Sequence, residues 1–267
     1  MKIAWFTEDN VFGEDLTPLK EEIKSQGMDV IEDKYIPFQG GEYSELFKPY
    51  DLVIFYGSLN LARQLTQEKH KNLVIYSTVA SYECTKYYAY LAKFLLNKDY
   101  VMMPFSELKR QREFLYHTFG SKGQIFVRPS SGEKTFTGTL VNENSFDKDY
   151  KLLGFYDVEP HAMVVISTPK EIKKEWRLVV SGSDIISGSL YHDSTMNCDY
   201  EGYPEEVGVL AKKVIAEYNP DPVLTVDICQ TADGELHLLE IGGFSCAGMY
   251  SNDVKKVVSS VSSIANK

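Results

Sequence analysis

The chain has 267 residues, of which 43% are hydrophobic and 25% charged, a composition typical of a globular protein with room for two modest domains. Its formal net charge of −10 argues against general nucleic-acid binding and against an anionic-membrane surface, because affinity for phosphate groups rises with cationic density. No apolar run approaches the roughly 20 residues that span a bilayer, and the first residues lack the apolar core of a signal peptide. We therefore expect a cytoplasmic protein with no membrane partner, in which a local cationic pocket is still compatible with the net charge.

The cysteines are widely spaced and include no Cys-x-x-Cys pair. Most have apolar neighbours, which is typical of buried thiols rather than of disulfides or a zinc site. We expect free thiols at Cys84, Cys198, Cys229 and Cys246.

The first part of the chain alternates between strand-like and helix-like segments. Strands are predicted at residues 2–7, 29–31, 51–56 and 72–76, and a helix at residues 15–25. The continuous apolar runs favour parallel strands that are covered on both faces, so the pattern predicts a Rossmann-like domain over residues 1–100. A dinucleotide site is not expected, because no Gly-x-Gly-x-x-Gly turn follows the first strand.

A tyrosine-rich helix is predicted at residues 82–96, where the spacing of the aromatic residues favours core or interdomain packing over a ligand platform. Pro104 and Ser106 introduce a second helix at residues 107–117, and Gly120 ends it. We place the domain boundary near residue 100, so that residues 101–267 form the second domain.

The second domain changes to a strand-rich pattern. Strands are predicted at residues 124–127, 163–167, 176–181, 185–191, 224–229 and 236–241, with helices near residues 204–218 and 252–265. Short turns at residues 181–184 and 231–234 are rich in residues that tolerate positive φ, which indicates hairpins. The predicted fold class is α/β (α+β), with an antiparallel sheet and packed helices in the second domain.

A loop at residues 126–138 has the features of a phosphate-binding loop. Gly132 and Gly138 allow the backbone to approach a ligand closely, while Arg128 and Lys134 supply positive charge. The loop does not match the P-loop pattern, because no Gly-Lys-Ser/Thr run opens a helix. The alternative is an ordinary glycine-containing turn between two strands, with both cations in solvent.

Two acidic residues stand in otherwise apolar strands. Asp227 and Glu240 lie on neighbouring predicted strands, where a buried carboxylate must bind a cation, pair with a basic side chain or become neutral. If they face each other across the hairpin, they supply the oxygen ligands that Mg²⁺ prefers. The alternative is a pair of strand-end carboxylates that are exposed to water or bound to arginine.

Strand alternation places Glu175 and Arg177 on one face and Trp176 on the other. The charged face is either part of a binding site or a simple ion pair between Glu175 and Arg177. Just before it, residues 164–171 form a strand that ends in an irregular connection, where backbone groups could meet a planar base.

Taken in order, several motifs resemble the ATP-grasp fold, and more narrowly its clade named for two arginines and a lysine, whose members are predicted amide-forming ligases. The motifs are RPSSGEKTFTG at 128–138, VIS at 165–167, EWR at 175–177, SGSLY at 187–191, TVDI at 225–228 and LLEIGGFSCAGMY at 238–250. The resemblance covers most of residues 100–267, and residues 1–100 resemble the domain that precedes many ATP-grasp modules.

The resemblance implies roles for individual residues. It assigns ATP phosphates to Arg128 and Lys134, and the transferred phosphoryl group or a substrate carboxylate to Arg177. It assigns magnesium binding to Asp227 and Glu240. The remaining nucleotide-binding candidates are Ile166, Ser167 and Thr168 at the adenine, Glu171 at the ribose, and Glu175.

One departure concerns the metal strand, which in many members of the superfamily ends Glu-x-Asn. Here Gly242 follows Glu240 and Ile241, so a third side-chain ligand is absent, and water, Ser245 or a substrate oxygen would have to fill the place. The first hypothesis is an ATP-dependent ligase that joins a small-molecule or peptide carboxylate to an amine through an acyl phosphate. The alternatives are an ATP-binding module without turnover and, third, nucleophilic catalysis by Ser245 or Cys246, which no His–acid arrangement supports.

Overall fold

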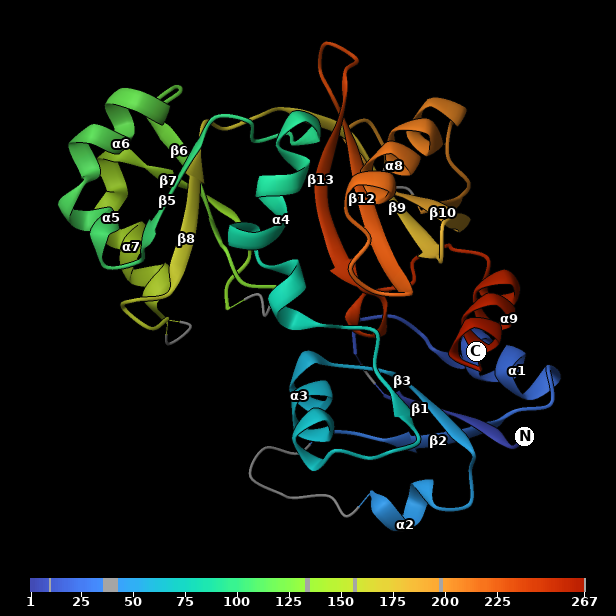
Figure 1. Cartoon of the computed structure of the whole chain (residues 1–267). Coiled ribbons are helices and arrows are strands. Elements are labelled where there is room, and N and C mark those ends of the chain that lie inside the picture. The colour runs from blue at the N-terminus through green and yellow to red at the C-terminus, as the bar shows by residue number, and fades with distance from the viewer. Residues whose placement is uncertain (10, 36–42, 133–134, 156–157, 197–198, 267) are drawn as a thin grey trace.

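The computed structural model describes residues 1–9, 11–35, 43–132, 135–155, 158–196 and 199–266, which form three sheets with helices packed on them (Figure 1). The first sheet is parallel, with strand order β2-β1-β3-β4. Its strands and helices are β1 (Ile3–Glu8), α1 (Thr17–Ser25), β2 (Asp29–Asp33), α2 (Ser44–Phe47), β3 (Leu52–Tyr56), α3 (Leu59–Glu68) and β4 (Leu73–Val74).

The second sheet is antiparallel, with strand order β5-β8-β6-β7. Helices α5, α6 and α7 lie against it in Figure 1, and their apolar residues pack with those of the strands. This unit comprises β5 (Tyr100–Pro104), α5 (Glu107–Arg110), α6 (Arg112–Phe119), β6 (Gln124–Pro129), β7 (Thr139–Asn142), α7 (Phe146–Gly154) and β8 (Met163–Ser167).

The third sheet is also antiparallel, with strand order β11-β10-β9-β12-β13. It comprises β9 (Ile172–Ser181), β10 (Asp184–Asp193), β11 (Tyr200–Glu201), α8 (Glu205–Glu217), β12 (Val223–Thr231) and β13 (Leu236–Gly243). The remaining helices are α4 (Cys84–Leu91), which comes before the second sheet in the chain, and α9 (Val254–Ala265) at its end.

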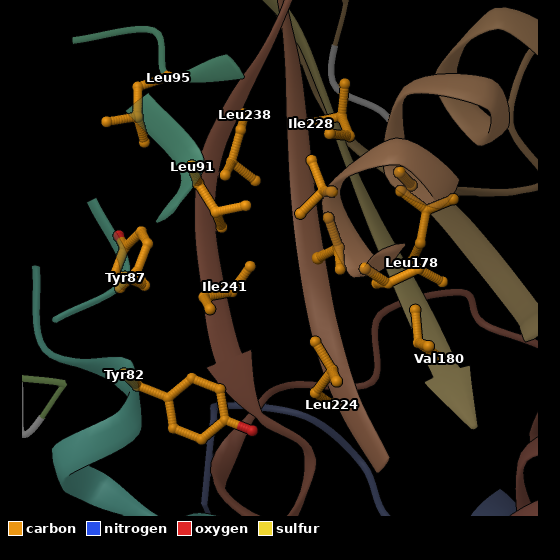
Figure 2. Packing of buried hydrophobic residues seen from close by; sticks show 14 of the residues in the cluster. Tyr82, Tyr87, Leu91, Leu95, Leu178, Val180, Leu224, Ile228, Leu238 and Ile241 are labelled. Atoms are coloured by element: carbon orange, nitrogen blue, oxygen red, sulfur yellow. The ribbon is translucent and has the colours of Figure 1, made fainter. Parts of the chain in front are cut away.

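The largest apolar cluster joins α4 and α8 to one face of the third sheet. Leu91 of α4 lies toward Leu238 and Ile241 of β13, and Tyr87 lies on the same side of β13 (Figure 2). Because Val165 of β8 also belongs to this cluster, apolar packing connects the second and third sheets. The opposite face of β9 and β12 carries the polar side chains Arg177, Thr225 and Asp227 and also Val179 and Val223, which pack in the apolar cluster of Trp5 and α9.

The parallel sheet is covered on both faces, as its apolar strands predict. Phe6 packs in a cluster with α2 and α3, while Trp5 packs on the opposite side with α1 and α9. The Trp5 indole Nε1 donates a hydrogen bond of 3.0 Å to Ser262 Oγ on α9. Helix α9 is therefore part of the core that covers β1. The boundary between the two domains near residue 100 stays a prediction.

Most predicted elements are confirmed, with shifts of a few residues. The two hairpin turns are also confirmed, with Gly182 at φ +64° and Gly234 at φ +88°, where glycine avoids the strain of a Cβ. The predicted α/β (α+β) fold with antiparallel sheet and packed helices in the second half is confirmed, and its strands form two sheets, because β5, β6, β7 and β8 pair separately from the others. The helix predicted at 107–117 is divided at Gln111, and strands β5 and β7 and helices α3 and α7 were not predicted.

None of the helices that the structure describes has both the length and the apolar character needed to cross a bilayer. Cys84, Cys229 and Cys246 are free thiols, as expected, whereas Cys198 lies outside the described residues.

The packing of α9 leads to a stability prediction. Replacing the buried Val257 of α9 by Ala should lower the free energy of unfolding by about 2 kcal/mol, since two buried methyl groups are lost and a cavity remains. The matched control is Val209→Ala on α8, where the side chain is 46% exposed and the same truncation should cost little. Urea unfolding monitored by circular dichroism compares the two, and equal losses would contradict the proposed role of α9.

Candidate active site

A cavity of about 50 Å³ lies where the three sheets approach one another. Leu59 at the start of α3 reaches it from the parallel sheet, and Arg128 of β6 from the second sheet. The third sheet contributes Arg177, Thr225 and Glu240. The cavity thus brings together residues that are far apart in the sequence and that include three of the predicted site residues.

Arg177 and Asp227 form a buried bidentate ion pair. They are register partners on β9 and β12, and the distances are 2.9 Å from Nε to Oδ1 and 2.6 Å from Nη2 to Oδ2. The side chains are only 8% and 3% exposed. Burial opposes the charge of Arg177, but the Asp227 carboxylate outweighs it and raises the pKa of the guanidinium well above its usual value. Arg177 is therefore a fixed cation.

Arg128 and Glu240 form a second ion pair, which bridges two sheets. Arg128 Nη2 donates to Glu240 Oε2 at 2.9 Å, from β6 to β13. Burial again opposes the charge, but nearby groups that include Tyr87 and Glu240 raise the pKa of Arg128 well above its usual value. This pair connects the predicted phosphate loop to the predicted metal strand.

The two carboxylates face each other across the β12–β13 hairpin, because Asp227 and Glu240 are register partners. This confirms their predicted placement. Each is bound to an arginine, as in the alternative interpretation. Among the described residues, no group of three or more His, Cys, Asp or Glu side chains is arranged to hold a metal ion. A metal here would need further oxygen ligands from a hydroxyl, from water or from a phosphate.

Glu175 is not paired with Arg177, which binds Asp227 instead, so the alternative of a simple Glu175–Arg177 ion pair is wrong. Its carboxylate instead accepts a hydrogen bond from the Tyr191 hydroxyl on β10, and burial raises its pKa above the usual value. The prediction for the opposite face is correct, because Trp176 packs in the apolar cluster.

Two stacked aromatic rings lie beside Arg177. Tyr191 stacks on Tyr250 with ring centroids 4.5 Å apart and an interplanar angle of 7°. The guanidinium lies 5.6 Å and 5.0 Å from these two centroids. Arg177 Nη1 also donates to the Gly248 carbonyl at 3.2 Å, so the loop after β13 helps to fix the cation.

The predicted adenine connection begins at the end of β8. Ile166 is fully buried in the core of the second unit, so only its backbone is suited to meet a base. Ser167 is also fully buried, and its hydroxyl has no hydrogen-bond partner among the described residues. After Thr168, Glu171 pairs with Lys173 and lines a separate hollow of about 440 Å³. The structure therefore does not place Glu171 in the cavity of the arginines.

The predicted phosphate loop is anchored to the start of α4. The backbone N–H of Cys84 donates to the Ser130 carbonyl at 2.8 Å, and a Cβ at Gly132 would lie 3.3 Å from Tyr82 Cβ. Gly132 therefore allows the loop to pack closely on the chain before α4. Lys134, the second predicted cation of the loop, lies outside the described residues.

Neither candidate nucleophile is suited to attack. The Ser245 hydroxyl is buried and accepts the Tyr76 N–H at 2.9 Å, which also makes it a poor metal ligand. Burial raises the pKa of the Cys246 thiol to about 12, so it is protonated at neutral pH.

Several residues of the site were not predicted. Tyr191 and Tyr250 were quoted in motifs without a role, and Thr225 was quoted only as part of TVDI. The position of Thr225 could have indicated that it belongs to the site, because it precedes Asp227 by two residues and so shares its face of the strand. Nothing in the sequence pattern indicated Glu14, which accepts hydrogen bonds from the backbone N–H groups of Met249 and Tyr250.

A comparison with protein families matches residues 106–260 to the model described as "ATP-grasp domain, R2K clade family 2". No match to curated proteins is found. Among solved structures, D-cycloserine synthetase DcsG has a TM-score of 0.69 at 13% identity, covering 99% of this chain and 100% of the other.

Two further structures are similar in fold. D-alanine–D-alanine ligase from Bacillus anthracis has a TM-score of 0.62 at 11% identity, with 100% of this chain and 97% of the other covered. The ATP-grasp ligase PsnB, solved with a minimal precursor, has a TM-score of 0.58 at 13% identity, with 98% and 99% covered.

The raised pKa of Glu175 predicts a pH effect on stability. Below the usual pKa of 4.5 the Glu175 carboxyl group is protonated in both the folded and the unfolded protein. As pH rises through the higher pKa of the folded protein, the carboxylate must ionise where it is buried, and the stability that the protonated group gives the folded protein is lost. Glu175→Gln removes this loss, so its stability relative to wild type should increase from about pH 4 to neutrality.

Urea unfolding at a series of pH values measures this difference. Glu171→Gln is the control, because that carboxylate is exposed and Lys173 lowers its pKa. A Glu175→Gln difference that does not change with pH would show that the carboxylate is ionised at no cost.

Proposed function

This chain belongs to the R2K clade of ATP-grasp domains, and on that premise we propose that it is an ATP-dependent ligase that joins a carboxylate to an amine through an acyl phosphate. The observation that carries the proposal is the row of charges that runs Arg128–Glu240–Asp227–Arg177 from one sheet to the next. It combines two cations suited to phosphate and carboxylate oxygens with two carboxylates suited to Mg²⁺.

The residues present fit a magnesium–nucleotide complex. Mg²⁺ in nucleotide sites is commonly held by one or two carboxylates together with phosphate oxygens and water, so Asp227 and Glu240 are sufficient in number. The Ser167 hydroxyl, which has no hydrogen-bond partner in the described part of the chain and stands at the end of the strand predicted to meet adenine, is a second observation that fits a nucleotide. When bound, magnesium would neutralise phosphate charge and align the phosphates for transfer.

Arg177 is preorganised for an anion. A guanidinium has five N–H groups, and three of them donate to Asp227 and Gly248. Each terminal nitrogen keeps one N–H without a partner among the described residues. Because the cation is already fixed, little conformational entropy is lost when these two groups bind a carboxylate or a phosphoryl group.

Substrates are proposed by class only. The carboxylate and the amine would belong to small molecules or peptides, the range that the names of the similar structures cover. No protein nucleophile is required, in agreement with the buried Ser245 hydroxyl and the high pKa of Cys246. Arg177 would position the acyl phosphate for attack by the amine.

A second candidate function is ATP binding without turnover. It is favoured by the arginine partners of both carboxylates and by Gly242, which adds no ligand to the metal strand. The two functions differ in one measurable product, ADP.

The test is calorimetry with ATP in the presence and absence of Mg²⁺, followed by an assay of ADP release against a panel of carboxylates and amines. We expect tighter ATP binding with Mg²⁺, and ADP release only when both substrates are present. Binding without ADP release or positional isotope exchange for any pair would favour the second function, and a folded protein that binds no ATP at millimolar concentration would contradict both.

Separate roles for Lys134 and Arg177 predict different kinetics. Lys134→Ala should mainly weaken ATP binding, since its charge acts on phosphate in the ground state and the transition state alike. Arg177→Lys keeps a cation beside Asp227 but removes the two N–H groups of the guanidinium that are proposed to bind the substrate anion. Turnover should therefore fall by roughly 100-fold, with a smaller change in ATP affinity. Full turnover in Arg177→Lys would assign Arg177 to structure alone.

A further inference from the structure

Thr225 brings a third oxygen to the row of carboxylates. It lies on β12 two residues before Asp227, so both side chains share one face of the strand. Thr225 is 3% exposed and lines the cavity together with Glu240 and Arg177. Its hydroxyl donates to the Gly242 carbonyl at 3.3 Å, which is long for an O–H···O bond. The oxygen lone pairs are not used by this bond.

Gly242 explains why the hydroxyl has room. It is the register partner of Thr225 on β13, and a Cβ built on it would lie 3.0 Å from Thr225 Oγ1. A larger side chain at position 242 and the Thr225 hydroxyl would therefore compete for the same space. Because residue 242 is glycine, the Thr225 side chain occupies this space.

Other candidate oxygens nearby are less suitable. Ser245 is fully buried, and its oxygen already accepts the Tyr76 N–H. Asp227 and Glu240 each use oxygen lone pairs for an arginine. A hydroxyl is a known type of ligand for nucleotide-bound Mg²⁺, and as a neutral group it adds no repulsion beside two carboxylates.

We propose that Thr225 Oγ1 is the third protein oxygen of the magnesium site that Asp227 and Glu240 begin. This inference rests on the proposed function, because it requires that the site holds a magnesium–nucleotide complex. It assigns the missing ligand to the neighbouring strand instead of to water, to Ser245 or to the substrate.

The first test measures Mn²⁺ affinity by electron paramagnetic resonance in the presence of the non-hydrolysable ATP analogue AMPPNP. Thr225→Val keeps the shape of the side chain but loses the oxygen, and affinity should fall by about tenfold or more, whereas Thr225→Ser should stay within about twofold of wild type. The matched control is Thr7→Val, a buried threonine in the parallel sheet, which should leave Mn²⁺ affinity unchanged.

A second test exchanges the two positions. Gly242→Asn alone should disturb the site, because its side chain meets Thr225 Oγ1. Thr225→Ala/Gly242→Asn removes the clash and supplies an oxygen from β13, so it should recover Mn²⁺ affinity relative to Thr225→Ala. Urea unfolding shows whether each variant is folded under the assay conditions.

The outcomes separate this inference from the proposed function. If wild type binds no Mn²⁺–AMPPNP, both are overturned. If wild type binds the complex and Thr225→Val binds it equally well, only the role of Thr225 is overturned. If Thr225→Val unfolds, the comparison of Thr225→Ser and Thr225→Ala decides, and equal affinities in these two variants overturn the inference.

Discussion

A buried guanidinium is tolerated only beside a carboxylate of matching geometry, and Arg177 meets that condition with Asp227. The pair does not stand alone, since Asp227 faces Glu240 across the hairpin and Glu240 is bound to Arg128. Each arginine in this row is paired with a carboxylate. The two carboxylates are also neighbours, but their repulsion is reduced because each is paired with its own arginine. The four side chains therefore hold one another in place without a bound ion. A ligand would bind where the positive and negative charges already compensate each other.

This balance has a consequence for how ligands would bind. A metal that approaches Asp227 and Glu240 must share them with two arginines, and those arginines can turn their remaining N–H groups to phosphate or carboxylate oxygens. Metal and anion binding would thus be coupled through the same four side chains. Such coupling would favour the joint binding of Mg²⁺ and nucleotide over the binding of either alone.

Sequence reasoning predicted what depends on local pattern. The strand that contains Asp227, the turn at Gly234 and the strand that contains Glu240 together determine that the two carboxylates face each other. The pattern left arginine partners as one alternative but could not predict which arginines they are, because Arg128 and Glu240 are 112 residues apart and on different sheets. The separate second sheet was also missed, since β7 has only four residues and carries little periodicity.

Glu175 shows the same limit at the scale of one side chain. Alternation correctly placed it on the face of Arg177, but its partner depends on β10, where an irregularity in register lies between Leu190 and His192. Irregular register changes the direction of a side chain without a clear signal in the sequence. The role proposed for Thr225 likewise depends on the absence of a side chain at Gly242, on another strand.

The contact between Trp5 and Ser262 joins residues 257 positions apart and has a consequence for synthesis on the ribosome. The strands of the parallel sheet are translated well before α9, yet α9 covers one face of that sheet. Until α9 has left the exit tunnel, Trp5 and Ile54 lack part of their cover and present an apolar surface. The parallel sheet is therefore translated early but completes its core late, and in the interval its uncovered face is a surface that chaperones can bind.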